Sequence, residues 1–207
     1  MDSESYRTIE GRAQAEIVEK KSRFIGHLCH VETEEEAVGF LNEIRAEHLM
    51  ARHNVYAYVL RSGRIRYSDD GEPAQTAGMP SLDVLLHGDL QDVALVTTRY
   101  FGGILLGTGG LVRAYTSAAQ AAIEAAHVVV ITRCVDLVIE LPYALYEQAQ
   151  RLVDGETAKV WDTDFGAQVL LTVRARAGTE GTLIKALTEL THGSCEIMVE
   201  GPFDAAF

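Results

Sequence analysis

Paired cysteines, a basic leader and long apolar runs are all missing from this sequence of 207 residues. Its three cysteines, Cys29, Cys134 and Cys195, are odd in number and far apart. They therefore argue against a disulfide framework or a zinc site and favour reduced thiols. The longest candidate apolar run, Val128–Thr132, is the size of a strand, whereas crossing a bilayer takes roughly 18–20 residues. The acidic start at Met1-Asp2-Ser3-Glu4 does not resemble a signal peptide. We expect a soluble, cytoplasmic protein with no membrane contact and no bound metal.

Positive charge is also scarce, with 18 Lys+Arg against 30 Asp+Glu and a formal net charge of −12. Broad affinity for nucleic acid rests on neutralising phosphates with Lys and Arg, so no DNA specificity is expected. The imbalance is uneven, because residues 1–133 hold 13 basic and 18 acidic side chains, whereas residues 134–207 hold 5 and 12. An anion-binding surface is therefore expected in the first part of the chain.

The chain has enough apolar residues to fold, at 47% hydrophobic composition, and its periodicity predicts helices and strands throughout. Thr33 followed by three glutamates has the pattern of a helix start. The glycines and prolines of Ser68–Pro80 exclude regular structure along that whole segment. In the first part we predict strands within Ala13–His30, a helix from Thr33 to about His48, strands at Asn54–Leu60 and Ile65–Tyr67, a helix at Ser81–His87, a strand at Val93–Thr98 and a helix at Leu111–Ala126.

The rest of the chain has its own complete pattern of elements in the order β-α-β-β-α-β, which is typical of ferredoxin-like domains. We therefore predict an α+β protein of two domains, residues 1–132 and 133–207, with the boundary near Ile131–Cys134. The predicted elements of the second domain are a strand at Cys134–Leu141, a helix at Pro142–Val153, strands at Lys159–Thr163 and Ala167–Val173, a helix at Thr179–Leu190 and a strand at Cys195–Glu200.

A glycine-rich segment lies between a predicted strand and a predicted helix. Free backbone N–H groups at a helix start suit a phosphate or a carboxylate, and nearby arginines would add charge. The alternative is a tight turn that packs the helix on the sheet. The spacing matches neither the P-loop nor the dinucleotide fingerprint. The candidate anion-binding residues are Arg99, Gly102, Gly103, Gly107, Thr108, Gly109, Gly110 and Arg113.

An acidic segment places three carboxylates within five residues. Such a group of carboxylates could hold a hard divalent cation or supply an acid and a base. Aspartate, glycine and proline are equally ordinary turn residues, and we favour the interpretation as a loop anchor. With no nucleophile elbow and no His-Glu-x-x-His motif, we predict no catalytic residue and no cofactor. The residues of this motif loop are Asp69, Asp70, Gly71, Glu72, Pro73 and Thr76.

These two segments, SDDGEPAQTAGMP and TRYFGGILLGTGGLVRAY, closely resemble the signature of the YigZ/IMPACT family. Residues 48–58 and Lys21-Ser22-Arg23-Phe24 resemble two further blocks of that family. The resemblance implies a first domain of the split β-α-β fold shared with a small-subunit ribosomal protein and domain IV of elongation factor G. It implies a second domain like domain V of that factor.

The resemblance also implies a role near translation, because eukaryotic relatives regulate translation by competing for an activator of a nutrient-sensing kinase. Those relatives carry an extra N-terminal domain for that purpose, so the same partner is not expected here. Three hypotheses follow, of which we rank a non-enzymatic regulator that contacts RNA, the ribosome or a translation factor first. Purely structural motifs that serve a protein partner come second. An enzyme that acts on a phosphorylated or carboxylated small molecule, assisted by Mg²⁺, comes third.

Overall fold

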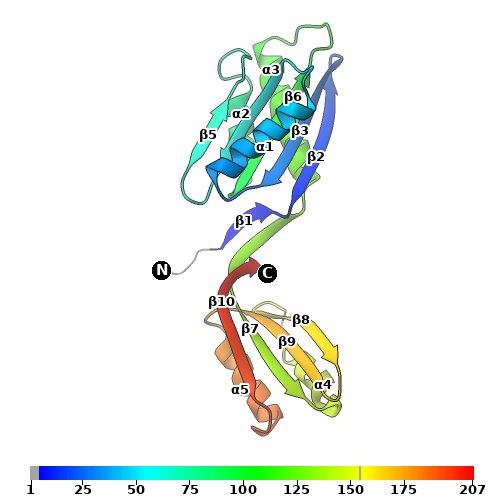
Figure 1. Cartoon of the computed structure of the whole chain (residues 1–207), viewed down its shortest axis with the longest axis vertical. Helices are drawn as coiled ribbons and strands as arrows, with labels where there is room; N and C mark the ends of the chain where they lie inside the picture. The colour runs from blue at the N-terminus through cyan, green and yellow to red at the C-terminus, as the bar shows by residue number, and fades with distance from the viewer. Residues whose placement is uncertain (1–4, 154) are drawn as a thin grey trace. The chain divides into compact units, whose positions relative to one another are not determined.

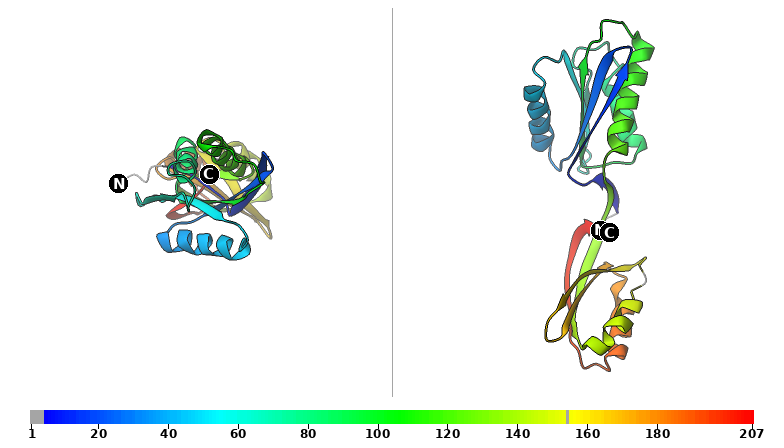
Figure 2. Two further views of the ribbon diagram at one scale, coloured as in Figure 1. Left: turned by 90° about the horizontal axis from the view of Figure 1, so that it is seen from above. Right: turned by 90° about the vertical axis from the view of Figure 1, so that its right-hand side faces the viewer.

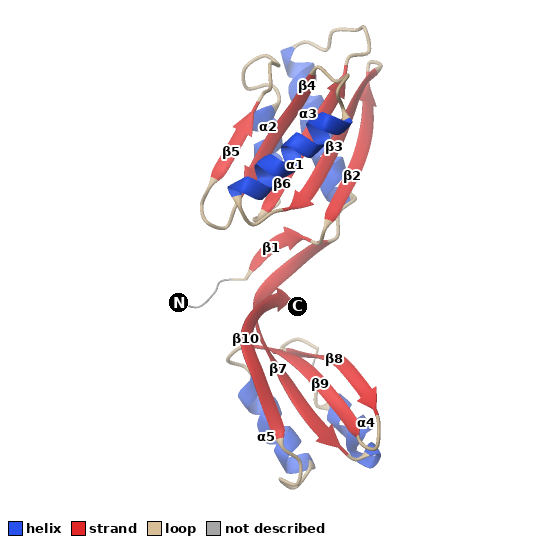
Figure 3. Ribbon diagram, viewed as in Figure 1, coloured by secondary structure: helices blue, strands red, loops and turns tan. Residues whose placement is uncertain are grey.

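The computed structural model describes residues 5–153 and 155–207 and divides them into two compact units. The first unit is residues 6–130, and the second is residues 131–207 together with Ser5. Both units mix helices with antiparallel strands (Figures 1 and 3), so the predicted α+β class is confirmed. No helix in these described ranges is long and apolar enough to span a bilayer.

The first unit is a five-stranded sheet covered by helices on both faces (Figure 2). The sheet has the strand order β2-β3-β6-β4-β5, and every neighbouring pair is antiparallel. The elements of this unit are β1 (Tyr6–Ile9), β2 (Arg12–Glu19), β3 (Ser22–His30), α1 (Glu34–Glu47), β4 (His53–Val59), β5 (Ile65–Ser68), α2 (Gly78–His87), β6 (Val93–Tyr100) and α3 (Thr108–Glu124).

Alternation along β4 shows how the sheet is buried on both sides. Ala57 and Val59 pack in the core that contains α2 and α3, whereas Tyr58 and Leu60 pack in the core that contains α1. Side chains of a strand point alternately to the two faces, so one short apolar run supplies both cores.

Two helices begin three residues earlier than predicted, which corrects the expected starts at Ser81 and Leu111. Helix α2 begins at Gly78 and includes Pro80 in its first turn, where a residue without an N–H is tolerated. Helix α3 begins at Thr108, so Gly109 and Gly110 belong to the helix rather than to the loop. Propensity alone misplaces both starts, because glycine and proline are poor residues in a helix interior.

The second unit has the ferredoxin-like arrangement predicted from its element order. Four of the five strands of its sheet lie in the order β10-β7-β9-β8, with antiparallel neighbouring pairs, and β1 also pairs with β7. Strand β7 begins six residues before the predicted Cys134, and the last strand continues to Ala206 across a register shift between Glu200 and Phe203. The elements are β7 (Val128–Leu141), α4 (Tyr143–Arg151), β8 (Ala158–Phe165), β9 (Val169–Arg176), α5 (Glu180–Leu190) and β10 (Ile197–Ala206).

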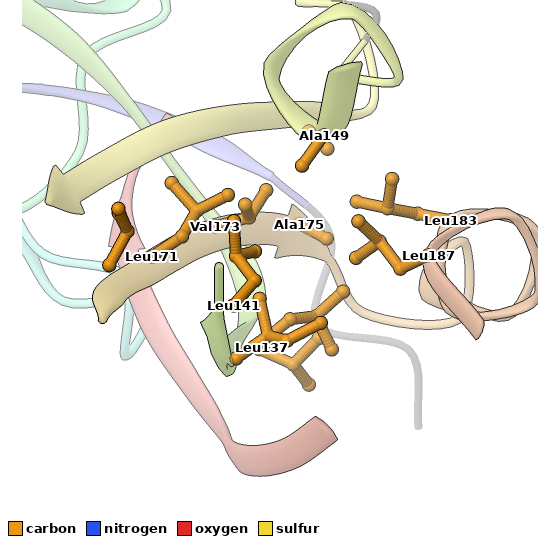
Figure 4. Packing of buried hydrophobic residues seen from close by; sticks show 12 residues of the cluster. Leu137, Leu141, Ala149, Leu171, Val173, Ala175, Leu183 and Leu187 are labelled. Carbon is orange, nitrogen blue, oxygen red and sulfur yellow. The ribbon is translucent and has the colours of Figure 1, made fainter. Parts of the chain in front are cut away.

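One apolar core holds this second unit together (Figure 4). Leu137 and Leu171 from the sheet are fully buried, as are Ala149 of α4 and Leu187 of α5. Both helices therefore cover the same face of the sheet, as the β-α-β-β-α-β order requires.

Candidate functional site

Four connections of the first unit meet at one end of its sheet, which we call the loop end. They are the β2–β3 turn at 20–21, the α1–β4 connection at 48–52, the β5–α2 loop at 69–77 and the β6–α3 loop at 101–107 (Figure 1). Strand pairing brings them together, because Arg99 near the end of β6 lies opposite both Phe24 of β3 and His53 of β4. Both segments that the sequence singled out therefore belong to one surface.

Glu72 is the centre of a buried polar cluster at the loop end. One oxygen of its carboxylate, Oε1, accepts a hydrogen bond from Arg99 Nη1 at 2.6 Å and another from Tyr115 Oη at 2.8 Å. All three residues are buried. Burial and the negative charge of Glu72 raise the pKa of Tyr115, so its hydroxyl stays a donor. The cluster ties the 69–77 loop to β6 and to α3.

Asp69 binds the start of α2 from outside the helix. Its Oδ1 accepts from the backbone N–H groups of Ala77 at 3.0 Å and Gly78 at 2.8 Å, and its Oδ2 accepts from Gln75 N at 2.8 Å. A carboxylate at this position satisfies helix-start donors and complements the helix dipole. Asp69 thus supplies the cap that the N-cap residue itself, Ala77, lacks.

Asp70 anchors the other side of the same loop. Its carboxylate accepts from Arg45 Nη2 at 2.8 Å and from Asn54 N at 2.7 Å. The His53 ring nitrogen Nδ1 donates to the Asp70 carbonyl at 2.8 Å. All three carboxylates of the motif loop are therefore bound within the protein, and these contacts favour the loop-anchor interpretation. Within the described residues no group of three or more His, Cys, Asp or Glu is placed to hold a metal ion.

The remaining motif residues shape this loop. Gly71 has φ +86°, which side chains rarely adopt, and it packs against the His53 ring. The Thr76 hydroxyl donates to the Pro73 carbonyl at 2.7 Å, which closes a turn after Glu72.

Of the two arginines that the sequence groups at the start of α3, only Arg113 is free there. Gly107, the N-cap, has φ +72° and provides no side-chain cap. Arg113 is exposed and folds back over this first turn, with Nη1 3.7 Å from where a Cβ on Gly109 would lie. Arg99 instead faces Glu72, and its charge is compensated there. The helix start therefore has one nearby free guanidinium rather than two.

Gly102 allows a close approach of two backbones. A Cβ at this position would lie 2.0 Å from the carbonyl carbon of Lys21, and the Gly102 N–H donates to Ser22 Oγ at 3.1 Å. Only glycine fits such a contact. It places the two exposed lysines of the hairpin turn, Lys20 and Lys21, beside the glycine-rich loop.

The structure also reveals surface residues that the sequence patterns did not single out as site residues. Around Arg99, which the sequence did single out, Arg52, His53, Phe101 and Leu105 line a cavity of about 180 Å³. Next to Arg52 in the chain, Leu49 and Met50 are 81% and 88% exposed. The sequence feature that could have predicted these residues is the combination of apolar and basic side chains in segments predicted to be turns. A search for catalytic motifs does not detect it.

Comparison with known proteins matches both parts of the chain to described domains. The model of the Impact N-terminal domain matches residues 20–123, and a domain of unknown function, DUF1949, matches residues 139–194. The IMPACT family member YigZ of Escherichia coli is 36% identical over 86% of this chain and 90% of that protein. The chain belongs to the IMPACT family.

One further member of the IMPACT family and two solved structures are also similar to this chain. YvyE of Bacillus subtilis is 51% identical over 113 residues, which are 54% of this chain and 52% of YvyE. A crystal structure of a hypothetical protein is 33% identical, with a TM-score of 0.61 and coverage of 96% of this chain and 97% of that one. The two-domain translational regulator Yih1 is 26% identical over 56% of this chain and 48% of that one, at a TM-score of 0.38, too low to support a comparison of folds.

Proposed function

We propose that this IMPACT family protein is a non-enzymatic regulator associated with translation, which contacts RNA, the ribosome or a translation factor through the loop end. Membership of the family carries the expectation of a role near translation. Fold and family alone do not fix a function, so the proposal rests on the chemistry of the surface.

The observation that carries the proposal is the division of charge at the loop end. The three carboxylates of the motif loop are bound internally, through Asp69, Asp70 and Glu72. Four exposed cations lie on or beside the same connections, and within the described part of the chain none of them has an ion-pair partner. They are Lys20, Lys21, Arg52 and Arg113.

A surface of this kind attracts an anionic partner even on an acidic protein. Electrostatic attraction acts over roughly 8–10 Å at physiological salt, so local charge matters more than the net charge of −12. The start of α3, with its uncapped N–H groups, adds a partial positive charge next to Arg113. The three carboxylates of the motif loop already accept hydrogen bonds within the protein, so they are not free to act as a base. This favours a binding function over catalysis.

Sedimentation of the full chain with ribosomes over a series of salt concentrations tests this proposal. About four phosphate contacts predict a slope of about −3 in log affinity against log salt. Combined Lys20→Ala and Arg113→Ala substitutions should weaken binding and make the slope shallower. Arg151→Ala combined with Lys185→Ala, at exposed residues of α4 and α5, is the matched control. Binding that is unchanged by the first pair would show that the loop end is not the contact surface.

A further inference from the structure

The cavity at the loop end has the chemistry of a pocket for a single acidic side chain. We propose that the Arg52–Leu105 pocket, the cavity lined by Arg52, His53, Arg99, Phe101 and Leu105, receives an aspartate or glutamate of a partner protein whose neighbouring residues are apolar. This inference rests on the proposed function and specifies the partner at this pocket alone: the group that enters it belongs to a protein rather than to RNA.

The size of the pocket fits one side chain. Its volume is about 180 Å³, below the roughly 300–1,000 Å³ of sites that enclose whole small-molecule ligands. Two of its walls are fixed by the sheet, because Arg99 is near the end of β6 and His53 begins β4, directly opposite it, whereas Arg52, Phe101 and Leu105 come from the connections. The part of the pocket that the sheet holds is preorganised, which lowers the cost of binding there.

Two guanidinium groups in the pocket favour a carboxylate. Arg52 is exposed, and no ion-pair partner for it exists among the described residues. Arg99 is paired through Nη1 with Glu72, but its Nε is buried without a hydrogen-bond partner within those residues. A buried donor left unpaired costs stability. An oxygen that enters past Phe101 would pair with this donor while Arg52 balances the incoming charge.

His53 forms a fixed wall of the pocket. The Asp70 carbonyl can only accept, so the Nδ1 of His53 carries the hydrogen in the 2.8 Å contact between them. The ring also packs against Gly71, with ring atoms 3.5 Å from where a Cβ would lie. The motif loop thereby holds the His53 ring in place, so that a loop with a structural role also shapes the binding pocket.

The rim of the pocket favours a protein partner over RNA. Leu105 is 82% exposed and Phe101 is 47% exposed, while Leu49 and Met50 precede Arg52 in the same connection and are almost fully exposed. Aromatic, methionine and arginine side chains are enriched in protein–protein interfaces, and an exposed apolar patch marks such a site. RNA would instead require a cation for each phosphate contact.

Two capped hexapeptides test the inference on the full chain: Gly-Leu-Glu-Phe-Leu-Gly and the same peptide with Gln for Glu. Binding is followed by amide and arginine Nε–H signals in ¹H–¹⁵N spectra. The Glu peptide should bind about tenfold more tightly, the effect of one charge-assisted contact. It should shift the Arg99 Nε–H signal. Arg52→Gln should remove the difference between the peptides, and Phe101→Ala should weaken both.

The control variant is Arg64→Gln, an exposed arginine paired with Glu34, which should leave peptide binding unchanged. Equal affinities for the two peptides, or no binding at about 5 mM peptide, would overturn the inference. Tighter binding of a uridine hexanucleotide at the same residues would assign the pocket to RNA and equally overturn it. Salt-dependent sedimentation with ribosomes, without peptide selectivity, would leave the proposed function standing and remove only the pocket. Selective peptide binding without ribosome sedimentation would support the pocket and contradict the proposed contact with the ribosome.

Discussion

At the scale of single residues, Glu72 links three elements of the first unit through one carboxylate. It accepts from Arg99 of β6 and from Tyr115 of α3, and both contacts are buried. A buried ion pair gains little over an apolar pair of the same shape, but the loss of one partner leaves an uncompensated charge. Stability at the loop end should therefore depend strongly on this residue.

Glu72→Gln keeps the shape of the side chain and removes its charge. We expect a loss of about 3–5 kcal/mol in the free energy of unfolding, because Arg99 then stays buried without its counter-ion. Urea denaturation measures it. Glu16→Gln, at the exposed pair with Arg23, is the matched control and should cost less than about 1 kcal/mol. Similar losses for the two variants would mean that Glu72 is not the anchor described above.

His27 makes the stability of the first unit dependent on pH. Its ring lies 5.0 Å from that of His48, and burial, followed by the charge of His48, lowers the pKa of His27 to about 4. The unfolded chain, with a His pKa of about 6.5, then binds the proton more tightly than the folded chain. Stability is therefore complete above pH 6.5 and is lost as the pH falls towards 4.

The His27→Gln variant isolates this effect. Between pH 7.5 and pH 4.5 the wild-type chain should lose roughly 2–3 kcal/mol more of its free energy of unfolding than the variant. Carboxylates that titrate in the same range are common to both proteins and cancel in the comparison. Urea denaturation at the two pH values measures the difference. Parallel pH profiles would show that His27 does not titrate as inferred.

At the scale of elements, the glycine-rich connection between β6 and α3 holds the β2–β3 hairpin. The contact of Gly102 with the backbone of Lys21 leaves no room for a side chain. The hairpin turn itself is tight, since Lys20 and Lys21 both have positive φ, at 44° and 65°. Movement of Gly102 would therefore move the two lysines that the proposed function places at the contact surface.

Gly102→Ala should destabilise the first unit by about 2 kcal/mol or more, because one of the two backbones has to shift. Gly39→Ala is a suitable control, since Gly39 is inside α1 with nothing within 4 Å of an added Cβ. That control should be neutral or stabilising by up to about 1 kcal/mol. Thermal unfolding of both variants measures the contrast, and an equally tolerated Gly102→Ala would refute the close approach.

The sequence predicts elements better than it predicts the contacts between them. Strong periodicity identified every strand of the two sheets except β1, and the Thr33 pattern located the start of α1, where Thr33 Oγ1 accepts from Glu36 N. The starts of α2 and α3 were missed because both begin with residues of low helix propensity, and at α2 a residue outside the helix stabilises them, as in the contact of Asp69 with Gly78. The pairing of Arg99 could not be predicted from the sequence either, since its partner Glu72 is 27 residues away.

At the scale of the whole molecule, the feature that matters is the unpaired positive charge at the loop end of the first unit. The chain is acidic overall, at −12, yet the loop end of the first unit exposes four cations, while the three carboxylates of the motif loop there are bound within the protein. The account therefore predicts that association depends on the position of positive charge and not on its total. This separates a specific contact surface from a general electrostatic effect of net charge.

Sedimentation with ribosomes of two full-length variants that have equal net charge tests this central claim most directly. One variant combines Arg52→Glu with Arg113→Glu at the loop end, and the other combines Arg151→Glu with Lys185→Glu on the helices of the second unit, where both residues are exposed. The account predicts that the first variant loses at least about tenfold in affinity, because like charge now faces the partner, while the second keeps wild-type binding. Equal losses in the two variants, or a loss only in the second, would contradict it.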